Sequence, residues 1–303
     1  MRALIGVDGS PGSYAAVELA GRILAADKDE IVLYYSPPAA TLHLLEDSSG
    51  VLSEVQLFLS DAVFNKGKEL LPDLFRSKVQ TVASTRRPEH GILLTASDRM
   101  VDLIVIGARG LGPLMQPTLG SVASHVVDHS AVPVLLVRGI VPDPGAPLRV
   151  LLASDGSALS HCASELLMRF SWPANTTGIA LTVIEPETQH KLPQWLTEQL
   201  DEAQLAALGM GQFPASEQEQ TFVQRGMEHW FGHLPKMFQS GSPIVVSGHA
   251  AEQILHAIDS NHIDIAVLGA HRLGPIQKMF LGSTSAHVVR QASCSVLIVR
   301  ERK

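Results

Sequence analysis

Leu103-Ile-Val-Ile-Gly107-Ala-Arg-Gly110 places an apolar run directly before a glycine loop, and Gly120-Ser121 follows after nine intervening residues. An apolar run that ends in glycine is typical of a buried strand and its turn. Ser121 then opens a pattern typical of an amphipathic helix. A strand, a glycine loop and a helix N-terminus form a cradle for phosphate, because unhindered backbone N–H groups point toward the anion. The segment therefore predicts a phosphate-binding loop, with the hydroxyl of Ser121 as an added donor.

The second half of the chain repeats this arrangement. Gly269 follows another apolar run, and Gly282-Ser283 lie 162 residues beyond Gly120-Ser121. Asp8 and the Gly-Ser after it recur at Asp155, at an offset of only 147 residues. The second copy therefore carries extra residues between its first and fourth strands, and we expect them within residues 186–220. A repeat of this length indicates a duplicated domain.

The two copies predict two domains of the α/β class, each with a doubly wound parallel sheet. Residues 139–147 are rich in glycine and proline, which break regular structure, so we place the domains at 1–140 and 148–303. Between the apolar runs lie helical patterns, including a long helical stretch over roughly residues 53–76. Strands that alternate with helices are typical of a sheet covered on both faces. We expect strands at 3–7, 30–35, 79–83, 103–106 and 134–137, and again at 149–153, 178–184, 244–247, 265–268 and 296–299.

Composition argues against several classes of partner. The formal net charge is −7, and the acidic excess is spread over both halves, which argues against nucleic acid or an anionic membrane. No apolar run approaches the roughly 20 residues of a membrane span, and the first residues lack the apolar core of a signal peptide. Two cysteines, Cys162 and Cys294, are too few for a disulfide framework. These features predict a cytoplasmic protein.

Asp8 is the second feature that points to a ligand. In open parallel sheets, ligands bind beyond the carboxyl ends of the strands where the strand order reverses. Asp8 ends the first strand and Gly107 ends the fourth, so neighbouring strands would bring both to one crevice. Aspartate and serine are also ordinary helix-capping residues, so the residues alone leave open a tight connection that binds no ligand.

The chain resembles tandem universal stress proteins, which carry two such domains in one polypeptide. The resemblance rests on Asp8-Gly-Ser, on residues 102–110 with Gly120-Ser121, and on the closing Pro133-Val-Leu-Leu-Val-Arg138. It implies a five-stranded parallel sheet in the order 3-2-1-4-5 in each domain. Family members commonly pair through the fifth strand. The resemblance therefore implies an internal pseudo-dimer joined through the two fifth strands, and it leaves open whether two chains associate as a homodimer.

The ATP-binding branch of this family carries the motif Gly-x2-Gly-x9-Gly-Ser/Thr, which the first copy satisfies. The resemblance implies that ATP binds there, with Mg²⁺ as a candidate bridge between its phosphates. Asp8 would face the adenosine, and the backbone near Tyr35, at the end of the second strand, would contact the adenine. The ribose and phosphates would be held by Gly107, Gly110, Gly120 and Ser121.

The second copy departs from the motif, because Arg272 stands where the first copy has Gly110. If this position requires a positive φ, an arginine there costs on the order of 1 kcal/mol or more. Its guanidinium could instead contact a phosphate directly. We expect weakened or absent ATP binding in this half. A weaker second site would consist of Asp155, Gly269, Arg272, Gly282 and Ser283.

The leading hypothesis is an ATP-binding stress-response protein that acts as a sensor or scaffold. No Walker lysine follows the loop and no carboxylate is evident as a base, so we predict no catalytic residues and at most slow hydrolysis. A slow ATPase or nucleotidyl transferase, and a nucleotide-free interaction module, are the alternatives. His125, Asp128 and His129 have the spacing of metal ligands on a helix, but no third-ligand motif accompanies them, and we expect a solvated face.

Overall fold

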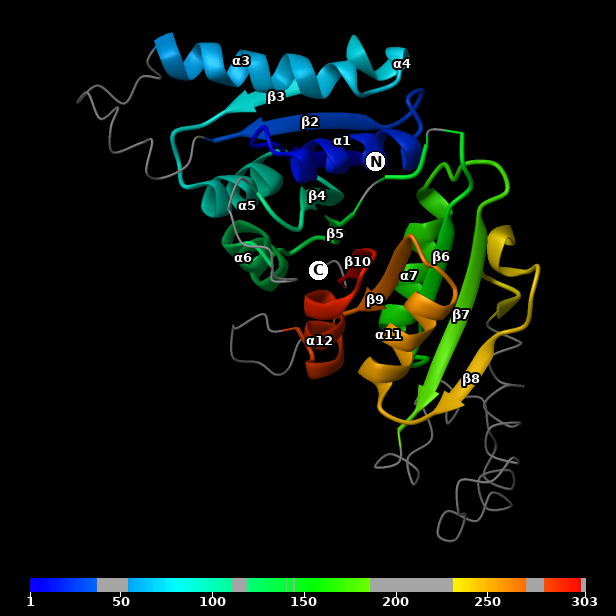
Figure 1. Cartoon of the computed structure of the whole chain (residues 1–303). Helices are drawn as coiled ribbons and strands as arrows, with labels where there is room; N and C mark the ends of the chain where they lie inside the picture. The colour runs from blue at the N-terminus through cyan, green and yellow to red at the C-terminus, as the bar shows by residue number, and fades with distance from the viewer. Residues whose placement is uncertain are drawn as a thin grey trace, which may run out of the picture.

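The computed structural model describes residues 1–36, 54–110, 119–139, 141–143, 145–185, 231–270 and 281–300. Within these ranges, the first half of the chain alternates strands with helices (Figure 1). Its strands are β1 (Arg2–Gly6), β2 (Glu30–Tyr35), β3 (Gln80–Ala83), β4 (Leu103–Gly107) and β5 (Val134–Val137). Its helices are α1 (Pro11–Ile23), α3 (Glu54–Glu69), α4 (Asp73–Arg76), α5 (Pro88–Asp98) and α6 (Ser121–His129).

The second half repeats this order. Its strands are β6 (Arg149–Ala153), β7 (Thr177–Ile184), β8 (Ile244–Ser247), β9 (Ile265–Gly269) and β10 (Ser295–Val299). Its described helices are α7 (Ala158–Arg169), α11 (Ala250–Ser260) and α12 (Ser283–Gln291), with a short 3-10 helix, η2 (Lys236–Phe238). The extra residues expected within 186–220 lie outside the described residues, and the domain bounds stay a prediction.

The helical stretch predicted over roughly residues 53–76 forms two helices with a break between them. The chain leaves α3 after Glu69 and starts α4 at Asp73. Pro72 lies between them with extended backbone angles, φ −51° and ψ 145°. Proline has no N–H to donate and its ring clashes with the preceding helical turn, so it ends a helix rather than continuing it. The break packs against α1, because a β-carbon on Gly21 would lie 3.0 Å from both Leu71 and Pro72 side-chain carbons.

All ten strands form one sheet in the order β3-β2-β1-β4-β5-β10-β9-β6-β7-β8. Each half therefore has the order 3-2-1-4-5, and its own strands pair in parallel. The halves join where β5 and β10 pair antiparallel, with Leu135 opposite Leu297. The predicted fold class, with its internal pseudo-dimer, is confirmed.

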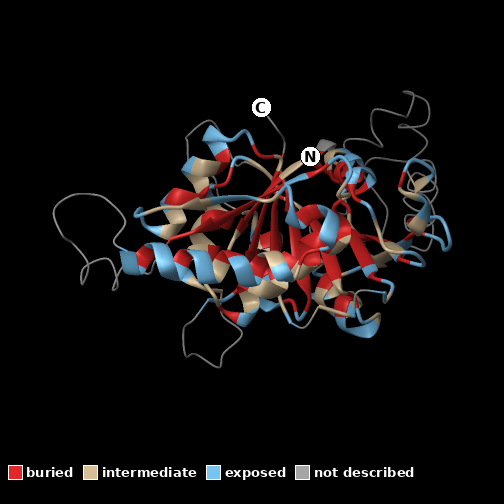
Figure 2. Ribbon diagram, turned by 90° about the horizontal axis from the view of Figure 1, so that it is seen from above, coloured by how far each residue is buried: buried red, intermediate tan, exposed pale blue. Residues whose placement is uncertain are grey.

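Helices cover both faces of the sheet, and the strands between them are buried (Figure 2). One apolar core contains Val17 of α1, Phe64 of α3 and Leu166 of α7. The core on the other face contains Val126 of α6 and Val288 of α12. Because strand side chains alternate between faces, nearly every residue of the central strands is apolar. This explains why the strands could be predicted from uninterrupted apolar runs.

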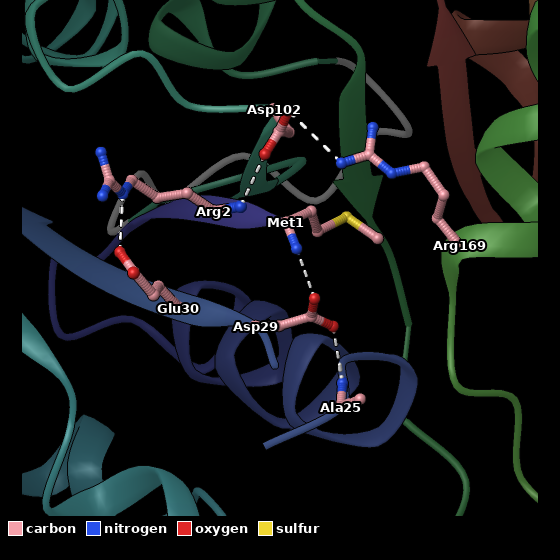
Figure 3. Close-up of polar contacts among 7 residues, drawn as sticks. All are labelled: Met1, Arg2, Ala25, Asp29, Glu30, Asp102 and Arg169. Carbon is pink, nitrogen blue, oxygen red and sulfur yellow. Dashed lines mark hydrogen bonds and ion pairs between the residues drawn. The ribbon is translucent and has the colours of Figure 1, made fainter. Parts of the chain in front are cut away.

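Aspartates just before the fourth strands join the first and fourth strands of each half, and Asp102 also contacts the other half. Asp102 accepts a hydrogen bond of 2.7 Å from the backbone N–H of Arg2 and lies 3.4 Å from Arg169 Nη2 of the second half (Figure 3). Asp264 accepts the equivalent bond, also 2.7 Å, from the N–H of Arg149. These carboxylates tie the first and fourth strands of each half together at their amino ends.

Among the described residues, no helix is long and apolar enough to cross a bilayer.

Candidate functional site

A cavity of about 710 Å³ opens at the carboxyl ends of β1 and β4. These strands are direct neighbours, with Gly6 opposite Ile106, and the chain crosses to opposite sides of the sheet after them. The expected crevice at the reversal of strand order is therefore present. Its lining includes five of the six residues predicted for the first site, namely Asp8, Gly107, Gly110, Gly120 and Ser121.

The turn after β1 holds the Asp8 side chain in one orientation. Gly9 has a φ of +85°, a conformation that glycine adopts without strain. Asp8 Oδ1 accepts hydrogen bonds from the backbone N–H of Ser10, at 2.9 Å, and from its hydroxyl, at 2.5 Å. Ser10 in turn caps α1 by accepting the N–H of Ser13 at 3.2 Å. The capping network thereby leaves Asp8 Oδ2 facing the glycine loop.

Glycine is required in this loop because backbone and carboxylate occupy the space of a side chain. A β-carbon on Gly110 would lie 2.4 Å from Asp8 Oδ2. A β-carbon on Gly107 would lie 2.7 Å from the backbone of Gly12, and one on Gly12 would lie 2.8 Å from the carbonyl oxygen of Arg109. Contacts under 3 Å would force the backbone apart. The loop therefore lies directly on the first turn of α1.

The helix that follows the loop presents its N-terminus to the cavity. Gly120 is the N-cap of α6 and has no side chain to satisfy the first N–H groups. Its own N–H donates to the carbonyl of Ala108 at 2.8 Å, which fixes the two ends of the loop against each other. Gly120, Ser121 and the two residues after them line the cavity. Free N–H groups and the helix dipole make this end attractive to an anion.

The opposite wall is formed by the end of β2 and the start of α5. Tyr34, Ser36, Arg87 and Glu89 line the cavity there. Burial raises the pKa of the Tyr34 phenol, so this ring enters the site as a neutral group. A β-carbon at Gly91 of α5 would lie only 1.8 Å from the Tyr34 hydroxyl oxygen, so glycine makes room for the phenol.

Tyr35 is the predicted site residue whose side chain lies elsewhere. It is 6% exposed and packs edge-to-face against Phe64 in the core, with ring centroids 6.3 Å apart. Its carbonyl accepts the N–H of Ser84 at 3.0 Å. The next residue, Ser36, lines the cavity instead. An adenine contact from the Tyr35 backbone stays a prediction.

A family model described as the universal stress protein family matches residues 1–138 and 238–300. The chain belongs to this family. The unmatched stretch covers the start of the second half and the residues where the extra segment was expected.

Some relatives named universal stress proteins align with nearly the whole chain, and others align with about half of it. One from Mycobacterium tuberculosis is 24% identical over 98% of this chain and 94% of its own length. Universal stress protein YxiE of Bacillus subtilis is 28% identical and matches 45% of this chain with 97% of its own length. A solved universal stress protein from Archaeoglobus fulgidus is similar in fold, with a TM-score of 0.60, 19% identity, and coverage of 100% of this chain and 98% of that one.

The second half of this universal stress protein keeps the aspartate turn but carries a leucine in place of Gly12. Asp155 Oδ1 accepts the N–H of Ser157 at 3.0 Å, as Asp8 does with Ser10. The counterpart of Gly12, at the same offset of 147 residues, is Leu159. Leu159 is 6% exposed, and its β-carbon lies 3.1 Å from where a β-carbon on Gly269 would be. By sequence offset, this β-carbon corresponds to the one that, if built on Gly12, would lie 2.8 Å from the Arg109 carbonyl oxygen.

Of the other residues predicted for the second site, Gly282 has different surroundings from its counterpart, whereas Ser283 has the same position at a helix start. Among the described residues, no atom lies within 4 Å of a β-carbon built on Gly282, whereas one on Gly120 would lie 3.3 Å from the Ala108 carbonyl oxygen. Ser283 opens α12 as Ser121 opens α6. Arg272 lies outside the described residues. The side chain of Glu185 caps the start of α11, accepting the N–H of Ala250 at 2.9 Å.

The histidines of α6 form a cluster with α5 beside the cavity. The rings of His125 and His129 stack with centroids 4.1 Å apart, and His90 of α5 packs edge-on to His125 at 5.0 Å. Within the part of the chain that the structure describes, no set of three histidine, cysteine or acidic side chains has the arrangement of a metal site.

The structure adds site residues that the motif does not contain. Gly12 supports the loop from below, and Ser13 donates its hydroxyl to the Ser10 carbonyl while lining the cavity. Arg87 and Arg109 bring positive charge to opposite walls. A signal for Gly12 was present, since the first copy reads Asp-Gly-Ser-Pro-Gly where the second reads Asp-Gly-Ser-Ala-Leu.

Proposed function

We propose that this universal stress protein binds ATP in the cavity of its first half and acts in the cytoplasm as a sensor or scaffold. The observation that carries the proposal is the cradle in which Gly107, Gly110 and Gly12 pack so closely that a β-carbon on any of them would meet backbone or carboxylate under 3 Å away. Such close backbone approach, ending at an open helix N-terminus, is the arrangement that binds phosphate.

The size and polarity of the cavity suit a nucleotide. About 710 Å³ lies within the range of roughly 300–1,000 Å³ typical of small-molecule sites. One end carries the glycine loop, Arg109 and the start of α6, which would receive the phosphates. The other end offers apolar surface from Val7, Ile92 and Ile106, which would pack on the base.

Asp8 suits the sugar better than the phosphates. An ionised carboxylate accepts hydrogen bonds but donates none, so it would repel a phosphate and attract ribose hydroxyls. Ser10 holds only Oδ1, and Oδ2 lines the site. Mg²⁺ would bridge phosphate oxygens at the loop end, as it does when bound mainly through substrate phosphates and water.

We place a single ATP in the chain. Leu159 stands at the position where the first half has Gly12, and its side chain would need the space that the close approach of a phosphate loop requires. Glu185 adds a negative charge after β7, whereas Ser36-Pro-Pro follows β2 in the first half. Both features disfavour binding of a nucleotide phosphate. They add to the effect expected from Arg272, which stands where the first half has Gly110.

Sensing rather than turnover follows from the groups available. Among the described residues that line the cavity there is no lysine, and Asp8 is held in the turn by Ser10. The test is to denature the freshly purified protein, identify the released small molecules by mass spectrometry, and follow phosphate release from added ATP. The proposal predicts a co-purified adenine nucleotide and phosphate release no faster than in an Asp8→Ala variant. Multiple turnovers that depend on Asp8 would favour the slow ATPase, and absence of any bound nucleotide would favour the interaction module.

A further inference from the structure

Arg300 reaches from the second half of the chain into the first. It follows β10 directly, its side chain is buried with the residue only 6% exposed, and its Nη2 donates a hydrogen bond to the carbonyl of Val127. Val127 lies in the last turn of α6, where helix carbonyls have no partner within the helix. A buried guanidinium at this place both satisfies a carbonyl and complements the negative end of the helix dipole.

Arg138 makes the pseudo-symmetric contact, from the first half of the chain to the second. It follows β5, and its Nη1 and Nη2 donate to the carbonyls of Ala292 and Val289, each at 2.5 Å, at the end of α12. Val289 is the counterpart of Val127, and Arg138 that of Arg300, at the shared offset of 162 residues. Each half therefore holds the last helix of the other half by its C-terminus.

The two arginines hold the C-termini of α6 and α12, and the N-termini of these two helices have different surroundings. The N-terminal residues of α6, Ser121–Ala123, line the cavity of the first half. A helix of nine residues is only about 13 Å long and moves as a rigid rod. A tether at Val127 therefore restrains the N–H groups that face the cavity. The start of α12 belongs to the half in which Leu159 stands in place of Gly12.

We propose that Arg300 is a positioning residue for the nucleotide cavity, so that the second half, without a nucleotide of its own, sets the affinity of the first. The proposal rests on the proposed function, since it concerns the same cavity. The second half would act through Arg300, which contacts α6 of the first half, and not through its own altered glycine motif.

The experiment compares Arg300→Met with Arg138→Met in the full chain. Both variants keep an apolar stem of similar length and remove one guanidinium from the same pseudo-symmetric interface. ATP affinity is measured by calorimetry at low salt and at about 1 M salt, where the Debye length is only about 3 Å and a distant charge no longer acts on the nucleotide. Amide hydrogen exchange of the nucleotide-free proteins reports where each helix loosens.

For Arg300→Met we expect faster exchange in α6 and a loss of ATP affinity of roughly fivefold, the lower end of ordinary coupling between sites. The loss persists at high salt. Arg138→Met loosens α12 and leaves affinity within about twofold of the unmodified chain. Arg300→Lys, which keeps the charge, gives a smaller loss of the same sign and serves if the methionine variant does not fold.

Unchanged affinity in both Arg300 variants, equal losses in the Arg300 and Arg138 variants, or a loss that vanishes at high salt would overturn the inference. Failure of the unmodified chain to bind ATP would instead overturn the proposed function and, with it, this role of Arg300.

Discussion

The carboxylate of Asp8 occupies the space that a side chain at Gly110 would need, because a β-carbon there would lie 2.4 Å from Asp8 Oδ2. Ser10 donates two hydrogen bonds to this carboxylate, so moving it aside breaks its contacts with the residue that caps α1. The glycine motif and the aspartate turn are thus parts of one packing arrangement, although about 100 residues separate them.

Gly110→Arg should abolish ATP binding, because its side chain must displace Asp8 or fill the cavity. Displacing Asp8 breaks its bonds to Ser10 but leaves the apolar core intact, so we expect a folded protein with a modestly lower melting temperature. Calorimetric titration with ATP measures the effect. Gly241→Ala is the matched control, since a β-carbon at Gly241 meets nothing within 4 Å. Wild-type affinity in Gly110→Arg would show that the cradle does not hold the nucleotide.

Gly12→Leu installs the residue that the second half carries at Leu159. A β-carbon at Gly12 would lie 2.8 Å from the Arg109 carbonyl oxygen, so the loop must lift from α1. We expect at least a tenfold loss of ATP affinity, or about 1.4 kcal/mol, with circular dichroism unchanged. If Gly12→Leu binds ATP as tightly as the unmodified chain, Leu159 does not explain the asymmetry between the halves.

Much of the fold could be predicted because burial on both faces of a parallel sheet leaves uninterrupted apolar runs. The bounds of β2, β5, β6 and β8 match the expected ranges. The break at Pro72 was missed although the proline is plain in the sequence, since the apolar spacing continues past it. Aligning the two halves at an offset of 162 residues shows that Arg272 replaces Gly110. The replacement of Gly12 by Leu159 becomes visible only when the starts of the halves are aligned at an offset of 147.

Other site features could not be predicted from sequence. The importance of Gly12 depends on its contact with Arg109, which only the packing of α1 under the loop creates. The bond from Arg300 to Val127 joins residues 173 apart, and no local pattern marks it. The core position of the Tyr35 side chain follows from strand alternation, which puts Tyr34 rather than Tyr35 on the face of the cavity.

The histidine cluster should make the fold less stable in acid. Burial, then His129 and His90, lower the pKa of His125, while Glu89 and Asp128 oppose the shift. The unfolded chain therefore binds more protons at this site than the folded one. The stabilisation is complete above the unfolded pKa of about 6.5 and is lost as the pH falls through the lower folded pKa.

Melting temperatures of the unmodified chain and of His125→Gln, measured from pH 8 down to pH 5, test this effect. The melting temperature of the unmodified chain should fall relative to that of the variant as the pH falls, because the variant has no imidazole to charge. Parallel curves over the whole range would mean that His125 does not titrate differently in the folded protein.

The aspartate that joins the halves should matter more than the exposed ion pair beside it. Asp102→Ala leaves the N–H of Arg2 without its acceptor and removes the contact to Arg169, so we expect a loss of about 1–3 kcal/mol in the free energy of unfolding. Glu30→Ala removes a 2.8 Å pair to the Arg2 side chain, but Glu30 is half exposed and should cost under about 1 kcal/mol. Urea unfolding compares them, and equal losses would contradict this ranking.

The number of ATP molecules bound per chain tests the central claim most directly. Titration of nucleotide-free protein should give one site per chain, and Gly110→Arg should reduce it to none. Two equivalent sites would show that the second half binds despite Leu159 and Arg272. One site that survives Gly110→Arg would place the nucleotide outside the cavity of the first half and contradict the account.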